Sequence, residues 1–480
     1  MKASRGSLLA LAIPAILGAQ GLRISGVTTM QLVELRPLVL DSLAASLVPG
    51  TGESRTVAGV PAVCSVSSAF CQFERSGNRV SATPVLQDVT IAGWGWVEGL
   101  SFHGDVRART QLSGDAAFVY PLTDDHLELL DAYAQLDRDT WQGRLGRQWV
   151  TGSLGAYAFD GANALWRHDA LTLEGWTGRA LVAGLNEPYT SAQLAAIDNT
   201  PPQQNGYLFG ARARYRPDPL TAATLTYQRV LVADRSGLYS ERASLDASTR
   251  QFSAALDLGL NYDFATGDWN EARLRVGTGG TGPLGYSIEA RHSRPFFELW
   301  TIWGAFSPVG FDEARATVDW RPSTSQFSYS LRGAYRKYGA SNTGISLRTN
   351  GWRAGGDARW QGEGALSAYG SYDVDIGSGA ANTDVRAGGR WLASSGLSFG
   401  ADLMVTQNIY EFRIGTGRIY GASLDGAVPI TPDVRLVVDG GLYQHMLTNG
   451  APGPDWTQRR ASVRIEWMLG RDPGMGVKTP

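Results

Sequence analysis

Charged side chains recur at alternate positions over most of this sequence, and arginine is the most regular of them. Arginine binds carboxylates in a bidentate way that lysine cannot match, and lysine is rare in this chain. A wall of such side chains orders water and, where one sign of charge dominates, biases which ions pass. Alternatively, opposite charges simply pair across strands and hold the wall rigid. The positions that carry the pattern are Arg107, Arg109, Arg212, Arg214, Arg353, Arg359, Arg386, Arg390, Arg435, Asp439, Arg464 and Glu466.

Catalytic and metal-binding chemistry has little support in the sequence. His103 and His445 share the parity of the charged residues and could meet Asp105 or Asp439, but no nucleophile stands near them. No triad, metal-ligand spacing or phosphate-binding loop is recognisable. We therefore expect no enzyme activity, no metal and no cofactor. The near-neutral net charge of −2 also argues against a nucleic-acid partner.

The charged positions belong to a two-residue period, which is clearest in the segment 460–469. There Ala461, Val463, Ile465, Trp467 and Leu469 alternate with charged or polar residues. Successive side chains of a β-strand point to opposite faces, so one face of this strand is apolar and the other is charged. The same alternation recurs from residue 88 onward, with no sustained helical period. The chain is therefore predicted to be all-β.

Strand length and connection length distinguish a soluble sandwich from a membrane barrel. The alternating segments number about twenty and run for roughly ten to thirteen residues, the length of a tilted strand that crosses a bilayer. Short connections such as 137–139 and 216–219 alternate with long ones such as 181–205 and 338–349. We predict a transmembrane antiparallel β-barrel over residues 87–469, with about 20 strands in a range of 16–22.

Aromatic residues stand just before most of the short connections, on the apolar parity. At one depth of a barrel they would form a girdle at the membrane boundary. A soluble sandwich offers no reason for such a ring. The six positions are Trp166, Tyr215, Trp320, Trp360, Trp391 and Trp467.

The two ends of the chain differ from the alternating region. Residues 1–21 have a basic start, a short apolar run and small residues at Ala19 and Gly21, as in an export signal. Residues 22–86 are predicted to be a small N-terminal periplasmic or plug-like segment. Cys64 and Cys71 are its only cysteines, and in an exported protein we expect them to form a disulfide. Residues 470–480 form a polar tail.

The alternating region resembles the outer-membrane porins of Gram-negative bacteria. The local match is Gly146-Arg147-Gln148 followed by Phe159-Asp160-Gly161, which is similar to a segment of substrate-type porins. The resemblance implies an outer-membrane location, insertion by the barrel-assembly machinery, contact with lipid, and a monomer or homotrimer. It also implies passive diffusion of small polar solutes through the charged lumen, where Arg-rich runs such as Arg212–Arg214 and Arg386–Arg390 would favour anionic ones. The tail departs from the terminal Phe with which these porins end.

Two other functions remain open at this point. The barrel could be a sheath around a periplasmic partner such as a multihaem cytochrome, or an outer-membrane hydrolase. A diffusion pore usually needs a segment that folds inward to narrow it. The predicted candidates are the connection 181–205 and the apolar segment 295–310.

Overall fold

The structure is a computed structural model of the 480-residue chain. It describes residues 21–50, 55–57, 60–64, 69–114, 126–183, 206–232, 240–251, 253–278, 282–294, 310–323, 325–339, 349–362, 364–377, 381–411, 415–448 and 455–470. Everything below refers to these residues.

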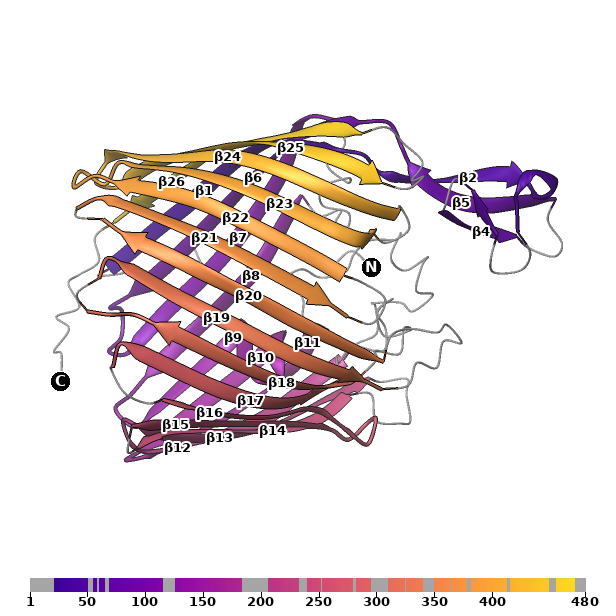
Figure 1. Cartoon of the computed structure of the whole chain (residues 1–480). Coiled ribbons are helices and arrows are strands. Elements are labelled where there is room, and N and C mark those ends of the chain that lie inside the picture. Colours follow the sequence, from indigo (N-terminus) through magenta and orange to yellow (C-terminus); the bar gives the residue numbers. More distant parts are fainter. Residues whose placement is uncertain are drawn as a thin grey trace.

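A closed antiparallel β-barrel of 22 strands forms most of the molecule (Figure 1). The all-β prediction is confirmed, and the strand number lies at the upper limit of the predicted range. The first strand, β1 (Gly21–Leu35), is followed in the wall by β6 (Val80–Trp94), β7 (Leu100–Ser113), β8 (Leu127–Asp137), β9 (Trp141–Gly152), β10 (Gly155–His168), β11 (Leu171–Ala183), β12 (Gly206–Asp218), β13 (Thr221–Val232), β14 (Ser240–Gln251), β15 (Ala254–Asp263), β16 (Asp268–Thr278), β17 (Leu284–Ser293), β18 (Phe311–Trp320), β19 (Phe327–Tyr338), β20 (Asn350–Gln361), β21 (Leu366–Ile376), β22 (Ala381–Leu392), β23 (Ser398–Glu411), β24 (Gly415–Thr431), β25 (Val434–Thr448) and β26 (Trp456–Leu469).

The two faces of the wall follow the two-residue period of the sequence. In β19, Tyr329 and Leu331 are exposed on the apolar face, whereas Arg332 and Arg336 on the other face bind carboxylates. Because directly opposed residues of neighbouring strands share a face, the register carries this division around the barrel. Among the described residues, no helix has the length and apolar character to cross a membrane.

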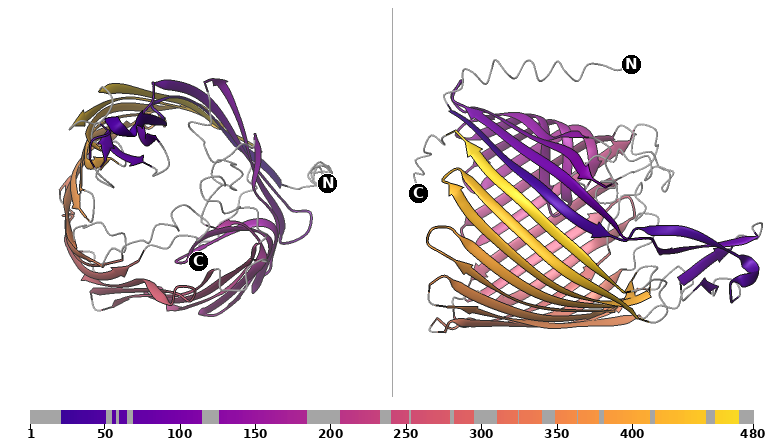
Figure 2. Two further views of the ribbon diagram at one scale, coloured as in Figure 1. Left: turned by 90° about the vertical axis from the view of Figure 1, so that its right-hand side faces the viewer. Right: turned by 90° about the horizontal axis from the view of Figure 1, so that it is seen from above.

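The connections at the two ends of the barrel differ in length. One end holds tight turns, including the turn between β10 and β11, where Asp169 has a φ of +49°. Asp tolerates this left-handed conformation because its short side chain bonds the local backbone. The first and last described strands also begin and end there, since Ile24 lies opposite Leu469. We call this end the short-turn end, and the opposite one the long-connection end (Figure 2).

The predicted boundary of the N-terminal segment at residue 86 is wrong. β1 is a full strand of the wall, paired with β26 on one side and β6 on the other. The barrel therefore closes by pairing β26 with β1, and not with the first strand of the predicted barrel region 87–469. The alternation of β1 is weak, since Thr28 interrupts its apolar face and Val27 and Val33 interrupt its polar face, and this weakness explains the error.

Residues 36–79 form an arm that projects beyond the long-connection end (Figure 1). The arm therefore lies at the opposite end from the described termini and does not plug the barrel (Figure 2). Its elements are β2 (Leu38–Ala44), η1 (Ala45–Leu47), β3 (Thr56–Val57), β4 (Val60–Cys64) and β5 (Phe70–Ser76).

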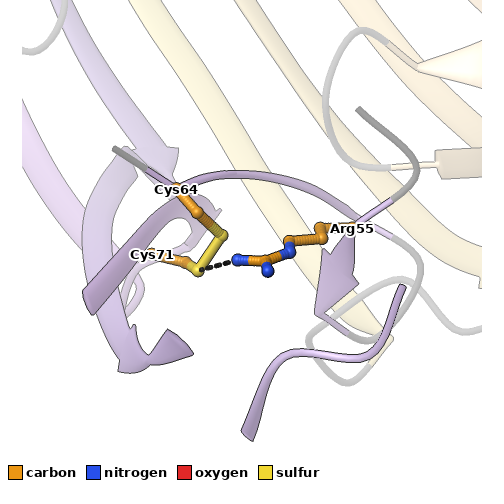
Figure 3. Close-up of a disulfide and its surroundings, with 3 residues drawn as sticks. All are labelled: Arg55, Cys64 and Cys71. Atoms are coloured by element: carbon orange, nitrogen blue, oxygen red, sulfur yellow. Dashed lines mark hydrogen bonds between the residues drawn. A yellow bond between two sulfur atoms is a disulfide. The ribbon is translucent and has the colours of Figure 1, made fainter. Parts of the chain in front are cut away.

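A small core and a disulfide stabilise the arm. Cys64 and Cys71 are directly opposed in β4 and β5 and are joined, as predicted (Figure 3). Cys71 is fully buried beside Phe73, and Arg55 donates a hydrogen bond to the Cys71 Sγ at 3.7 Å. On the surface, the hydrogen bond from Arg75 holds the pKa of the Asp41 carboxyl below its ordinary value.

Candidate pore constriction

A crease crosses three neighbouring strands toward the long-connection end. Gly146 of β9 lies opposite Gly161 of β10, which lies opposite Gly178 of β11. A Cβ on these glycines would stand 2.3 Å from the carbonyl oxygen of Ala132, 2.1 Å from that of Thr177 and 2.5 Å from that of Asp160, respectively. Gly146 also has a φ of +132°. Only glycine allows the strands to approach so closely, so this row lets the sheet bend sharply.

Beyond the crease, the β9–β10 hairpin leaves the wall. The pairing of β9 with β8 ends at Arg147 opposite Ala132, and the β10–β11 register shifts between Tyr157 and Phe159. Such an irregularity bends a strand and re-aims its side chains. In the view down the barrel, this magenta part of the ring curls into the lumen (Figure 2).

The porin-like motif lies at the base of this hairpin. Arg147 Nε donates to Asp160 Oδ1 at 2.8 Å, and Arg147 Nη1 donates to the carbonyl oxygen of Leu129 at 2.9 Å. The second bond links the hairpin to β8 where the strand ladder has stopped. The Gln148 side chain is 1% exposed and donates to the carbonyl oxygen of Gly161 at 3.0 Å. The motif residues therefore hold the hairpin at its exit from the wall.

An apolar cluster packs one face of the hairpin against the inner wall. Phe159 and Leu208 have no exposed surface, and each fully buried side chain of this size contributes about 1.5–3 kcal/mol by leaving water. The cluster joins strands that are not neighbours in the sheet, so the hairpin lies inside the barrel. Its members are Val150, Tyr157 and Phe159 from the hairpin, and Trp176, Leu208 and Val230 from the wall.

The tip of the hairpin is fixed by hydrogen bonds to β12 and β14. Arg242 Nη2 donates to the carbonyl oxygen of Leu154 at 2.7 Å, and Arg212 Nη2 donates to that of Thr151 at 2.5 Å. The Ser153 and Ser244 hydroxyl oxygens are 2.6 Å apart. Both guanidinium groups also lie over aromatic rings, with Arg242 5.7 Å from the Tyr157 centroid and Arg212 5.4 Å from that of Trp176. These contacts keep the hairpin docked against the wall, and we call them the latch.

The register places all twelve predicted charged residues on the face that Arg212 shares. Most of them are paired with opposite charges rather than presented alone. Arg214 lies opposite Thr172 and Thr224, and Asp439 accepts a hydrogen bond from Ser462. The ion pairs are Arg107–Asp88 at 2.7 Å, Arg109–Glu128 at 2.9 Å, Arg212–Glu174 at 3.1 Å, Arg353–Asp375 at 2.8 Å, Arg359–Asp357 at 3.7 Å, Arg386–Asp384 at 2.7 Å, Arg390–Asp425 at 3.4 Å, Arg435–Glu466 at 3.7 Å and Arg464–Glu466 at 2.9 Å.

The densest charge lattice lines a recess of about 670 Å³ on the wall formed by β18–β22. Arg332 bridges Asp373 at 2.5 Å and Asp357 at 3.2 Å. Arg336 lies between Glu313 and Asp375. Each cation here has at least one carboxylate partner, so the lattice presents alternating charge to the lumen rather than one sign.

The predicted girdle residues all lie at the short-turn end, on the face opposite the charges. Exposed aromatics that the sequence analysis missed stand at the same end, at the start of strands that follow short turns. They are Trp141, Phe327 and Phe399. A second group at the long-connection end was also missed, because its members lie toward the strand ends away from the short turns, where no aromatic ring was looked for. It comprises Tyr207, Trp269, Tyr335, Trp352 and Tyr420.

The inward hairpin itself was not predicted. The expected constrictions, 181–205 and 295–310, fall almost entirely on 184–205 and 295–309, outside the described residues.

The two histidines considered for chemistry have other neighbours than expected. His103 Nε2 lies 3.2 Å from Asp131 rather than Asp105, and His445 stacks on Trp456 with the ring centroids 4.5 Å apart. In the part of the chain that the structure describes, no group of His, Cys, Asp and Glu side chains is arranged to hold a metal ion.

No protein-family model and no curated protein matches the sequence. Solved structures that it resembles include a BenF-like porin from Pseudomonas fluorescens Pf-5, with 7% identity, a TM-score of 0.42 and coverage of 95% of this chain and 100% of that chain. OccAB2 of Acinetobacter baumannii has 11% identity, a TM-score of 0.40 and coverage of 95% and 99%. OpdQ of Pseudomonas aeruginosa has 10% identity, a TM-score of 0.35 and coverage of 93% and 98%. By its own strand pairing, this chain is a closed antiparallel β-barrel.

Proposed function

We propose that this protein is an outer-membrane pore through which small polar solutes diffuse passively. The observation that carries the proposal is the docked β9–β10 hairpin, which narrows a closed barrel whose outer face is apolar and whose inner face is charged. A barrel of this strand number is too wide for side chains to fill. A hairpin held against one wall leaves room beside it, as a diffusion pore requires. No catalytic step is proposed.

Orientation follows from the lengths of the connections. In outer-membrane barrels the short turns face the periplasm and the long connections face the outside. We therefore place the termini in the periplasm and the arm, residues 36–79, outside the cell. The export signal of residues 1–21, insertion by the barrel-assembly machinery and the choice between monomer and homotrimer remain proposals from the sequence.

Ion pairing within the lumen limits any preference for anions. Cations such as Arg386 and Arg390 are more than half exposed toward the lumen, but each has a carboxylate partner within 3.4 Å. Paired charges largely cancel at distances beyond the screening length of about 8 Å at physiological salt. We expect a modest charge preference at most.

Planar-bilayer recording tests the proposal. Protein extracted from outer membranes or refolded in detergent should give discrete conductance steps, and liposomes that carry it should swell in small sugars. Folded protein that inserts without conductance steps would refute the pore. It would favour instead the alternative of a sheath around a periplasmic partner.

A further inference from the structure

One side of the β9–β10 hairpin is turned away from the wall. Val150 and Tyr157 pack against the wall in the apolar cluster. Trp149, Thr151 and Ala156 have the opposite parity. Since successive side chains of a strand point to opposite faces, these three residues face the open lumen. They form what we call the free face of the hairpin.

The free face carries no charge, in contrast to the rest of the lumen wall. No Asp, Glu, Lys or Arg occurs between Gln148 and Ala158. The charges at the base, Arg147 and Asp160, neutralise each other at 2.8 Å. Arg242, on the wall beside the tip, is 4% exposed and bonded to the hairpin backbone. A solute that passes the hairpin therefore meets an uncharged surface on that side.

Trp149 gives this surface an aromatic contact. The residue is partly exposed, whereas the small Ala158 directly opposite it is buried. The exposed part of the indole offers a surface on which a flat or apolar group can stack. The other residues of the free face present small side chains and backbone, which set a size limit rather than a charge requirement.

We infer that the free face is a weak docking subsite for uncharged solutes with an aromatic or apolar surface, and that Trp149 determines this specificity. The inference rests on the proposed pore function and names the class of solute that the constriction favours. Water in the lumen, on the side away from the hairpin, solvates the polar part of the solute.

Solute block of single-channel current tests the subsite. The probe is N-acetyl-tryptophan amide, which is uncharged and aromatic, with glucose as a non-aromatic comparison. Trp149→Ala should weaken block by the amide roughly three- to tenfold, the contribution of one aromatic pair, and leave the response to glucose unchanged. Trp149→Phe, which keeps a ring, should retain most of the block.

Two further variants make the outcome decisive. Trp166→Ala removes an indole from the outer face of the neighbouring strand and should leave block unchanged. Thr151→Glu puts a charge on the free face and should shift the reversal potential in a salt gradient toward cation selectivity. The subsite is refuted if the amide blocks the current of Trp149→Ala as strongly as that of the wild type, or if Thr151→Glu leaves the reversal potential unchanged. If the wild type itself never conducts, the pore function fails instead.

Discussion

At the scale of single residues, Arg242 is the key contact of the constriction. It is the most buried arginine of the latch, and it satisfies the Leu154 carbonyl at the hairpin tip. A hydrogen bond from a charged donor contributes about 1.5–3 kcal/mol, and its loss leaves the buried carbonyl without its partner. The docking of the hairpin therefore depends strongly on this side chain, although Arg242 is far from the hairpin tip in the sequence.

Arg242→Ala should destabilise the docked hairpin by about 1.5–3 kcal/mol. The tip would then detach from β12 and β14 part of the time. Single-channel traces should show new, larger and noisier conductance levels. Arg250→Ala is the matched control, because Arg250 lies on the same face of the same strand but is exposed. Identical traces from the two variants would show that the latch does not hold the constriction.

At the scale of elements, the crease depends on the absence of three Cβ atoms. Gly161→Ala would place a methyl group 2.1 Å from the carbonyl oxygen of Thr177. We expect the barrel to lose at least about 1–3 kcal/mol through this overpacking, with a lower unfolding temperature in heat-modifiability gels. Gly175→Ala on β11 is the control, since its nearest neighbour would be 3.9 Å away. Equal unfolding temperatures for both variants would contradict the crease.

The arm is a separate element whose stability depends on its disulfide. In the chain-entropy account, a loop as short as that between Cys64 and Cys71 contributes about 2–3 kcal/mol. Replacing both cysteines by serine should therefore loosen the arm, so that trypsin cuts faster at Arg55 and Arg75. Conductance should not change, because β1 and β6 still pair beyond the arm. A loss of conductance would mean that the arm and the pore are coupled.

The sequence predicts the strands well and the constriction poorly, for a physical reason. A two-residue period is a local property, so the inward and outward faces of β20 or β26 could be assigned from residues alone. The period misleads at Ala92 and Trp94: continuing the parity of the next strand would place them on the apolar face, but the register places them on the same face as His103, because the turn after β6 shifts the parity. The crease needs Gly146, Gly161 and Gly178 in one cross-strand row, and register across three strands is not visible in a linear pattern.

At the scale of the whole molecule, the arm and the short turns lie at opposite ends of the barrel. In intact cells, trypsin should cut the arm at Arg55 and Arg75, because the proposed orientation places them outside. Arg138 and Arg167, which border short turns, should be cut only after the outer membrane is permeabilised. Mass spectrometry of the released peptides gives the answer, and the reverse pattern would invert the orientation.

The pairing of β1 with β26 has a consequence for assembly. Every other pair of neighbouring wall strands consists of strands that follow one another in the order of the chain. The β1–β26 pair instead joins the first and last described strands, with Val33 opposite Arg460. The wall can thus grow by local steps, but its two open edges remain able to pair with other chains until the final strand arrives. The order of synthesis therefore sets the time during which this protein depends on protection from aggregation.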